Sequence, residues 1–258
     1  MIPDSHAHLD LIEADSASVI AEARETGVSP IITVGTSVPS SLAAVVAAVE
    51  NEHVYAAVGV HPNDTSAASG DDMDRLAEIA ASSEKVVAIG ETGLDFYRER
   101  SPVEVQKEAF RAHARLAIRL GKPVVVHDRE AHSETLELLA EELDGEVPVV
   151  MHCFSGGRAV LDECVRRGYY LSFAGPVTFK NAALAREMAA LVPVDRLLCE
   201  TDAPFLSPEP HRGKPNVPAR VVLVARALAA ARGMPGSEMD GQLAANTARA
   251  FDLPGKDG

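Results

Sequence analysis

Short apolar runs rich in valine and isoleucine alternate along this chain with longer stretches whose apolar residues recur every three or four positions. The short runs predict eight β-strands, at residues 2–6, 30–34, 54–60, 86–90, 123–126, 147–152, 169–173 and 196–200. The longer stretches predict helices, such as the one that ends before Gly121. Strands that alternate with helices pair in parallel, and about 250 residues is a usual size for a (β/α)8 barrel. The pattern therefore predicts an α/β fold, a TIM barrel.

A doubly wound open sheet would show the same alternation, but no Gly-rich dinucleotide-binding turn follows the first predicted strand. No Pro/Gly/Ser linker divides the chain, and no internal repeat stands out. We expect one barrel domain over residues 1–252 and a disordered tail over residues 253–258, which read LPGKDG.

The chain of 258 residues carries a formal charge of −14. Sequence-independent binding to nucleic acid normally uses a basic surface, so the charge argues against it. It leaves open the entry of a nucleic-acid end into a pocket whose positive charge comes from metal ions. No apolar run approaches the roughly 20 residues that span a bilayer, and MIPDSHAHLD lacks the basic and apolar regions of a signal peptide. We expect a cytoplasmic monomer with no membrane partner.

Histidines gather where the predicted strands end. The residues that follow the strands of a barrel line its catalytic face, and five of the nine histidines fall there. Glu91, in IGETGLDFY, and Asp202, in ETDAPF, share this placement. The five histidines are His6, His8, His61, His127 and His152.

His6 and His8 stand one residue apart in DSHAHLD. Alternate strand residues point to one side, so both imidazoles can reach a single divalent ion. This pair alone is a weak signal, but ligand-type residues at four other strand ends strengthen it. Without His61, the set contains four imidazoles and two carboxylates. This is more than one open catalytic zinc needs, and it suits two metals bridged by a carboxylate.

The motifs DSHAHLD, GVHP, IGETGLDFY, MHCFSG, SFAGPVTFKNA and ETDAPFLSP, in this order, resemble those of the TatD family of metal-dependent hydrolases. The resemblance runs from residue 4 to about residue 251. It implies a TIM barrel with two divalent metals, and several members of the family are described as deoxyribonucleases. One departure is Val217, where the family often has an acid; it puts the substrate in doubt but removes no proposed ligand.

The resemblance also implies roles for the residues at the strand ends. His6, His8 and Asp202 would bind one metal, and His127 and His152 the second. Glu91 would bridge the two. Asp202 would in addition accept a proton from the attacking water, and His61 would lie near the substrate phosphate. Zn²⁺, Mn²⁺, Fe²⁺, Co²⁺ and, less comfortably, Mg²⁺ accept such ligands, so the identity of the metals stays open.

The predicted activity is hydrolysis of phosphodiester bonds in DNA, as an exonuclease. Candidate phosphate-binding cations follow the fifth, seventh and eighth predicted strands: Arg129, Lys180, Arg212 and Lys214. Two alternatives stay open. One is a metal-dependent esterase or amidase on the same barrel, acting for example on aminoacyl-tRNA, and the other is a non-catalytic metal-binding protein. Many amide-cleaving relatives bridge their metals with a modified lysine, whereas the fourth strand here ends at Glu91.

Several neighbouring residues have an ordinary interpretation. We expect surface or core roles for His53, His113, His132 and His211. Asp95 is expected either to orient a metal ligand or to cap a helix. Cys153 follows a proposed ligand directly, so strand alternation predicts that its side chain points away from the metals.

Overall fold

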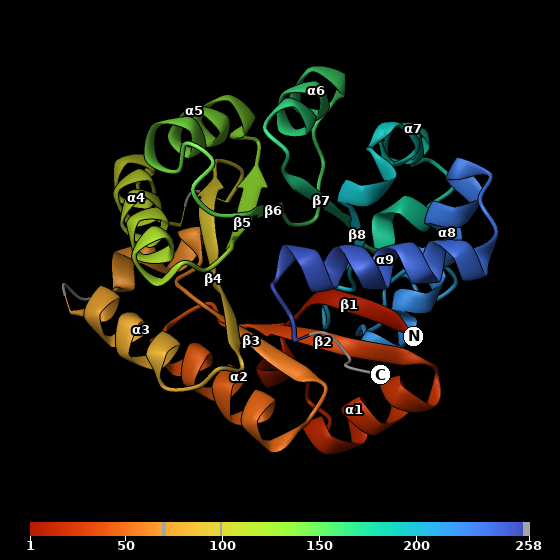
Figure 1. Cartoon of the computed structure of the whole chain (residues 1–258), viewed down its shortest axis with the longest axis horizontal. Coiled ribbons are helices and arrows are strands. Elements are labelled where there is room, and N and C mark those ends of the chain that lie inside the picture. The colour runs from red at the N-terminus through yellow and green to blue at the C-terminus, as the bar shows by residue number, and fades with distance from the viewer. Residues whose placement is uncertain (69–70, 99, 255–258) are drawn as a thin grey trace.

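The computed structural model describes residues 1–68, 71–98 and 100–254. Within them, eight parallel strands follow chain order in one sheet (Figure 1). Their bounds are β1 (Ile2–Ala7), β2 (Val28–Val34), β3 (Val54–Val58), β4 (Val86–Asp95), β5 (Val124–Arg129), β6 (Val149–Met151), β7 (Tyr170–Phe173) and β8 (Leu197–Cys199). Beyond the end of β8, Ala203 forms a parallel bridge with Ala7 and accepts the backbone N–H of His8 at 2.7 Å. The sheet therefore closes into a nearly complete barrel, and the predicted fold is confirmed.

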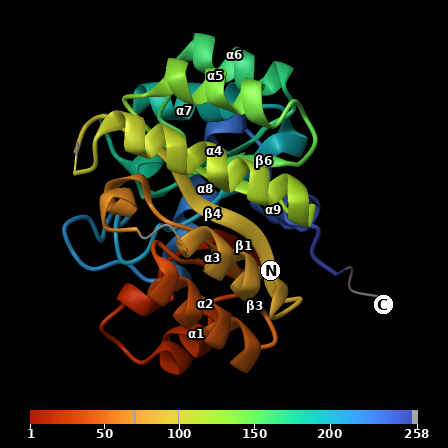
Figure 2. The same ribbon diagram turned by 90° about the vertical axis from the view of Figure 1, so that its left-hand side faces the viewer.

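Helices cover the outside of the barrel, and Figure 2 shows α2, α3 and α4 along one flank. Their bounds are α1 (Ser16–Glu25), α2 (Val38–Glu50), α3 (Asp72–Ala81), α4 (Val103–Leu120), α5 (His132–Glu142), α6 (Arg158–Arg166), α7 (Ala183–Leu191), α8 (Val221–Arg232) and α9 (Gly236–Ala250). Helix α4 shows how the sequence dictates this layer. It buries Phe110, Ala114 and Ala117 at three- and four-residue steps, and it ends where Gly121 takes a left-handed conformation, with φ of 62°.

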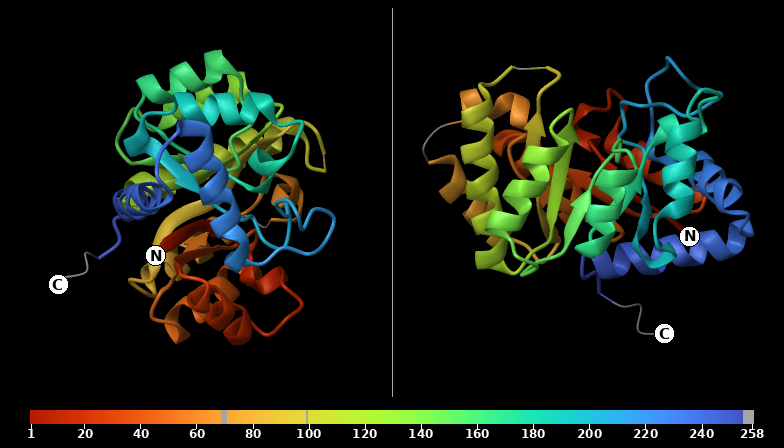
Figure 3. Two further views of the ribbon diagram at one scale, coloured as in Figure 1. Left: turned by 90° about the vertical axis from the view of Figure 1, so that its right-hand side faces the viewer. Right: turned by 90° about the horizontal axis from the view of Figure 1, so that it is seen from above.

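Strand and helix side chains form two separate apolar layers. The larger one packs the outer faces of the strands against the helices. The smaller one fills the barrel itself with inward-facing residues such as Ile32, Val125, Val150 and Leu198, and it is completed by Phe251 from the end of α9. Asn246 of α9 donates to the carbonyls of residues 194 and 197, at the start of β8, with both distances 2.7 Å. Helix α9 thus closes the end of the barrel at which the strands begin (Figure 3, right).

All eight predicted strands occur, but two of them continue at least three residues further than the apolar runs indicated. Strand β4 extends to Asp95 and β5 to Arg129, because residues 92–95 pair in register with residues 126–129. Gly93, with φ of 136°, permits this approach, since an added Cβ would overlap the carbonyl oxygen of His127. Glu91 and His127 therefore lie within strands rather than in the loops that follow them.

No helix in the described part of the chain combines the length and apolarity needed to cross a membrane. At the C-terminal end, Leu253 packs against the layer that contains Phe251. Residues 255–258 of the expected tail lie outside the described residues.

Candidate metal centre

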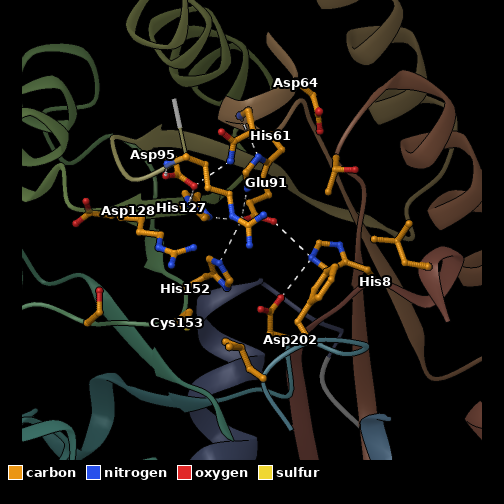
Figure 4. Close-up of a pocket in the computed structure, with 18 of the residues that line it drawn as sticks. His8, His61, Asp64, Glu91, Asp95, His127, Asp128, His152, Cys153 and Asp202 are labelled. Atoms are coloured by element: carbon orange, nitrogen blue, oxygen red, sulfur yellow. Dashed lines mark hydrogen bonds and ion pairs between the residues drawn. The ribbon is translucent and has the colours of Figure 1, made fainter. Parts of the chain in front are cut away.

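The seven residues predicted for the site converge at the carboxyl end of the strands, around one cavity whose lining residues are drawn in Figure 4. The cavity has a volume of about 800 Å³. Six of the seven residues line it directly: His8, His61, Glu91, His127, His152 and Asp202. The seventh, His6, is fully buried beneath them, and its imidazole stacks on that of His152 with ring centroids 3.9 Å apart.

Glu91 stands at the centre of this group and turns one oxygen toward each side. Its Oε1 lies 2.7 Å from Nδ1 of His127 and 3.1 Å from Nε2 of His152. Its Oε2 lies 3.4 Å from Nε2 of His6 and 3.6 Å from Nε2 of His8. The two oxygens of one carboxylate therefore face two different pairs of imidazoles.

Asp202 lies on the side of the β1 histidines. Its Oδ1 is 3.4 Å from Nε2 of His8 and 3.9 Å from Nε2 of His6. The backbone at Asp202 is left-handed, with φ of 54°, and its N–H donates to the carbonyl of His6 at 2.9 Å. This bond between the end of β8 and β1 holds the carboxylate against the imidazoles, and such sparsely populated backbone is common at functional sites.

The carboxylates of the site are ionised despite their burial. Glu91 is 2% exposed. Among the described residues, all of its ion-pair partners are imidazoles. Burial favours the neutral acid, but His152, His61 and His127 outweigh it and hold the pKa of Glu91 well below its usual range. Burial likewise opposes ionisation of Asp202, and the hydrogen bond from His8 with nearby imidazole charge lowers its pKa. Both groups are therefore anionic at neutral pH.

The same attraction acts in reverse on the imidazoles. Burial disfavours the charged form of His8, yet Asp202 and Glu91 raise its pKa to about 9. Carboxylate partners also raise the pKa of His127 and His152 against the effect of burial. Without metal, protons on these rings supply the positive charge that the buried carboxylates require, and divalent ions can replace them.

The hydrogen bond behind each ring shows which nitrogen is free to bind an ion. Nδ1–H of His8 donates to the carbonyl of Val34 at 2.8 Å, and Nδ1–H of His152 donates to Glu200 at 2.9 Å. Nε2–H of His127 donates to Asp95 at 3.2 Å. In the neutral form, each of these rings turns an unprotonated nitrogen toward Glu91 or Asp202, as a metal ligand must.

His61 has the opposite arrangement. Its Nδ1 accepts the backbone N–H of Asn63 at 3.0 Å, so the proton of the neutral ring is on Nε2. Burial, together with the charges of neighbouring imidazoles, lowers the pKa of His61 to about 4 although Glu91 opposes the shift. Nε2 lies 3.6 Å from Oε1 of Glu91. His61 is therefore a neutral hydrogen-bond donor at the cavity wall.

These residues fit divalent metals. Their ligand atoms lie within 4.8 Å of one another in three overlapping triplets: His6, His8 and Glu91; His6, His152 and Asp202; His61, Glu91 and His127. The third triplet contains His61, but the bond from Asn63 makes that ring a donor. Nitrogen and carboxylate oxygen ligands of this kind suit Zn²⁺ and other first-row divalent ions.

Three arginines approach the cavity from the ends of β4 and β5. Arg98, Arg100 and Arg129 line its wall, and the guanidinium of Arg129 lies 3.9 Å from the ring centroid of Tyr97. Four residues were predicted to bind phosphate, and among the described residues that line the cavity Arg129 is the one that belongs to this set. The other three are exposed to solvent and do not line the cavity: Lys180, Arg212 and Lys214.

Sequence reasoning missed Arg98 and Arg100 because the apolar run of the fourth strand ends at Gly90. It also missed Glu200, a fully buried carboxylate that accepts bonds from Nδ1–H of His152 and the backbone N–H of Cys153, both at 2.9 Å. The signal available for Glu200 was a carboxylate at the end of the eighth apolar run, two residues before Asp202.

Three residues near the site, for which ordinary roles were expected, have the following contacts. His113 is fully buried, donates to the carbonyl of Ala109 and accepts the N–H of Val60, so it supports the end of β3. His132 donates to Asp128 at 2.7 Å. The prediction for Cys153 is wrong: its side chain lines the cavity, because β6 ends at Met151 and a φ of 46° breaks the alternation.

Comparisons with known proteins place this geometry in a family. A family model described as TatD related DNase matches residues 3–252. The uncharacterized metal-dependent hydrolase YabD of Bacillus subtilis is 41% identical over 255 residues, which cover 98% of this chain and 100% of that protein. A protein of Citrobacter rodentium named 3'-5' ssDNA/RNA exonuclease TatD is 37% identical over 244 residues, which cover 93% of this chain and 92% of that protein.

A solved structure agrees with these sequence matches. The crystal structure of YjjV, a TatD homolog from Escherichia coli K12, matches with a TM-score of 0.92 at 30% identity and covers 98% of each chain. Family model, relatives and architecture agree over nearly the whole length, so the chain belongs to the TatD family of metal-dependent hydrolases.

Proposed function

We propose that this hydrolase uses two divalent metal ions to cleave phosphodiester bonds in DNA and acts as an exonuclease. The observation that carries the proposal is the placement of Glu91, whose two oxygens face different imidazole pairs. A carboxylate so placed can be shared by two ions, one held with His6, His8 and Asp202 and the other with His127 and His152. Two-ion sites suit in-line displacement at phosphorus.

When bound, the ions supply positive charge that favours deprotonation of the attacking water and offsets charge on the phosphoryl group. Asp202, anionic at neutral pH and partly open to the cavity, accepts the proton of that water. His61 directs Nε2–H into the cavity and donates to a phosphoryl oxygen. The chain itself thus contributes one base and one neutral donor.

The two sides of the cavity differ in a way that suits a nucleotide. Arg98, Arg100 and Arg129, from the β4 and β5 side, offer guanidinium groups that match phosphate geometry. On the opposite side of the cavity, the segments that follow β1 and β8 contribute the apolar wall residues Leu11, Phe205 and Leu206. Phosphate toward the arginines and base toward Phe205 is the orientation that this asymmetry favours.

Size and charge favour an end of a strand over the middle of a duplex. A cavity of about 800 Å³ lies within the range that holds small ligands. The chain has a formal charge of −14, so a long basic track for duplex DNA is not expected. The relative from Citrobacter rodentium is named as a 3'-5' exonuclease, which also supports action at an end.

The test is a metal-supplemented assay on single-stranded DNA labelled at the 5′ end or at the 3′ end. The proposal expects stepwise loss of terminal nucleotides with Zn²⁺, Mn²⁺, Mg²⁺, Fe²⁺ or Co²⁺ and none with chelator. The direction of loss identifies the end attacked. Turnover of carboxylic esters, amides or aminoacyl-tRNA without DNA cleavage would replace the phosphodiesterase proposal, and binding of metal without any turnover would favour a non-catalytic role.

A further inference from the structure

The imidazoles on the two sides of Glu91 differ in what lies behind them. On the β5 and β6 side, each ring donates its outer N–H to a buried carboxylate. Nδ1–H of His152 donates to Glu200 at 2.9 Å, and Nε2–H of His127 donates to Asp95 at 3.2 Å. Glu200 is 0% exposed and Asp95 1% exposed, so little solvent reaches either carboxylate.

On the β1 side, the described residues place no carboxylate behind either ring. Nδ1–H of His8 donates to the neutral carbonyl of Val34 at 2.8 Å. The buried Nδ1 of His6 has no hydrogen-bond partner among the described residues. One pair of imidazoles is therefore supported by two negative charges, and the other pair by one carbonyl dipole.

Each carboxylate accepts at least one backbone N–H in addition to its imidazole. Asp95 accepts the backbone N–H groups of residues 97 and 98 at 3.0 and 2.9 Å and the side-chain amide of Asn63 at 2.9 Å. Glu200 accepts the backbone N–H of Cys153 at 2.9 Å as well as the imidazole. Because these bonds fix the carboxylates, the rings of His127 and His152 are held with one nitrogen directed at Oε1 of Glu91.

A carboxylate behind a ligating imidazole fixes its tautomer and orientation and makes the free nitrogen more basic. We propose that Asp95 and Glu200 are positioning residues that make the two metal subsites unequal, so that the subsite of His127 and His152 binds its ion more tightly and fills first. The inference rests on the two-ion arrangement of the proposed function, but not on the substrate.

The test is calorimetric titration of metal-free protein with Zn²⁺. The wild type is expected to bind two ions in two resolved steps. Asp95→Asn and Glu200→Gln keep the shape of each side chain and remove its charge, and each is expected to weaken the tighter step about 10- to 100-fold. The weaker step should change by no more than about twofold in either variant, since His6 and His8 touch neither carboxylate.

Asp128→Asn is the matched control. Asp128 lies on β5 and accepts Nδ1–H of His132 at 2.7 Å, but His132 belongs to none of the three ligand triplets. Both Zn²⁺ steps should keep their affinities in this variant. A loss equal to that of Asp95→Asn would mean that any carboxylate–imidazole pair near the cavity has the same effect, and it would overturn the proposal.

A second measurement on the wild type does not depend on how the variants fold. Imidazole ¹⁵N resonances of His127 and His152 should move with the first equivalent of Zn²⁺, and those of His6 and His8 with the second. Simultaneous movement, the reverse order, or binding of fewer than two ions would overturn the inference. Two unequal ions in a protein that does not cleave DNA would refute the proposed phosphodiesterase and leave this inference intact.

Discussion

The two ends of the barrel place opposite kinds of side chain on the same strands. Where the strands begin, the interior is apolar and is closed by Phe251, which is 1% exposed. Where they end, Glu91 is equally buried but charged, and Cys153 and Asp202 have left-handed backbone. Buried charge and such backbone are costly to stability, whereas the apolar end contributes to it. We therefore expect stability and chemistry to be separable along the barrel axis.

The change expected to have the largest effect is at the chemical end. Glu91→Gln should lower kcat about a thousandfold or more, because the amide lacks the charge and the second acceptor oxygen that a bridging ligand requires. The metal content should fall as well. The measurement is turnover of labelled DNA by metal-saturated protein, with the far-ultraviolet circular dichroism spectrum as the control for folding. Unchanged turnover would refute the bridging role.

The counterpart at the other end is Phe251→Ala. Removal of a buried phenyl ring should lower the free energy of unfolding by about 3–5 kcal/mol, while kcat per folded molecule stays unchanged. Denaturant unfolding measures the first quantity, and the maximal rate of turnover divided by the concentration of folded protein measures the second. Leu184→Ala is the control, because this leucine is 56% exposed and its truncation should cost little. A loss of kcat in Phe251→Ala would show that the two ends are coupled.

A smaller effect is expected at His61, the donor in the wall. His61→Ala should lower kcat by about 10- to 100-fold without loss of metal, because one hydrogen bond to the substrate disappears. His61→Gln places an amide N–H near the position of Nε2 and should recover part of the rate. Metal content by elemental analysis distinguishes the roles: loss of an ion in His61→Ala would make His61 a ligand instead of a donor.

The strands differ in how completely the sequence alone determines them. All eight strands could be predicted, because strands of a parallel barrel are buried on both faces and appear as continuous apolar runs. The end of β4 could not, since residues 91–95 read ETGLD and owe their strand conformation to pairing with β5. The missed wall residues Arg98 and Arg100 follow from that error.

The candidate site shows the same division. His6 and His8 were predictable because one strand presents both, and the other candidate ligands were predictable because each follows an apolar run that forms another strand of the same barrel. Glu200 was missed because its partner, His152, is 48 residues away and the contact depends on how β6 and β8 are placed. Local patterns located the candidate ligands but not the carboxylates that lie behind their rings.

The smallest predicted effect concerns the stability of metal-free protein at different pH values. The pKa of His8 is raised from 6.5 to about 9 by Asp202 and Glu91 against the effect of burial. The folded state therefore binds the proton more tightly than the unfolded state, so this contribution is complete below pH 6.5 and is lost as the pH rises through 9. Thermal unfolding with chelator should show Tm falling over that interval.

Metal-loaded protein should not show this fall, because the ions replace the protons and bind more tightly as the pH rises. A parallel decline in both forms would mean that groups at the other end of the barrel, or on the surface, titrate instead. The two melting series thus test whether the protons and the ions occupy the same imidazoles.

The most direct test of the proposed two-metal site is the number of divalent ions bound per chain. Elemental analysis gives this number for protein that has been equilibrated with excess metal and then freed of unbound ions. We expect two ions in the wild type, at a site with Glu91 between two pairs of imidazoles. A single ion, or none under any condition, would contradict it, because Glu91 would then have nothing to bridge.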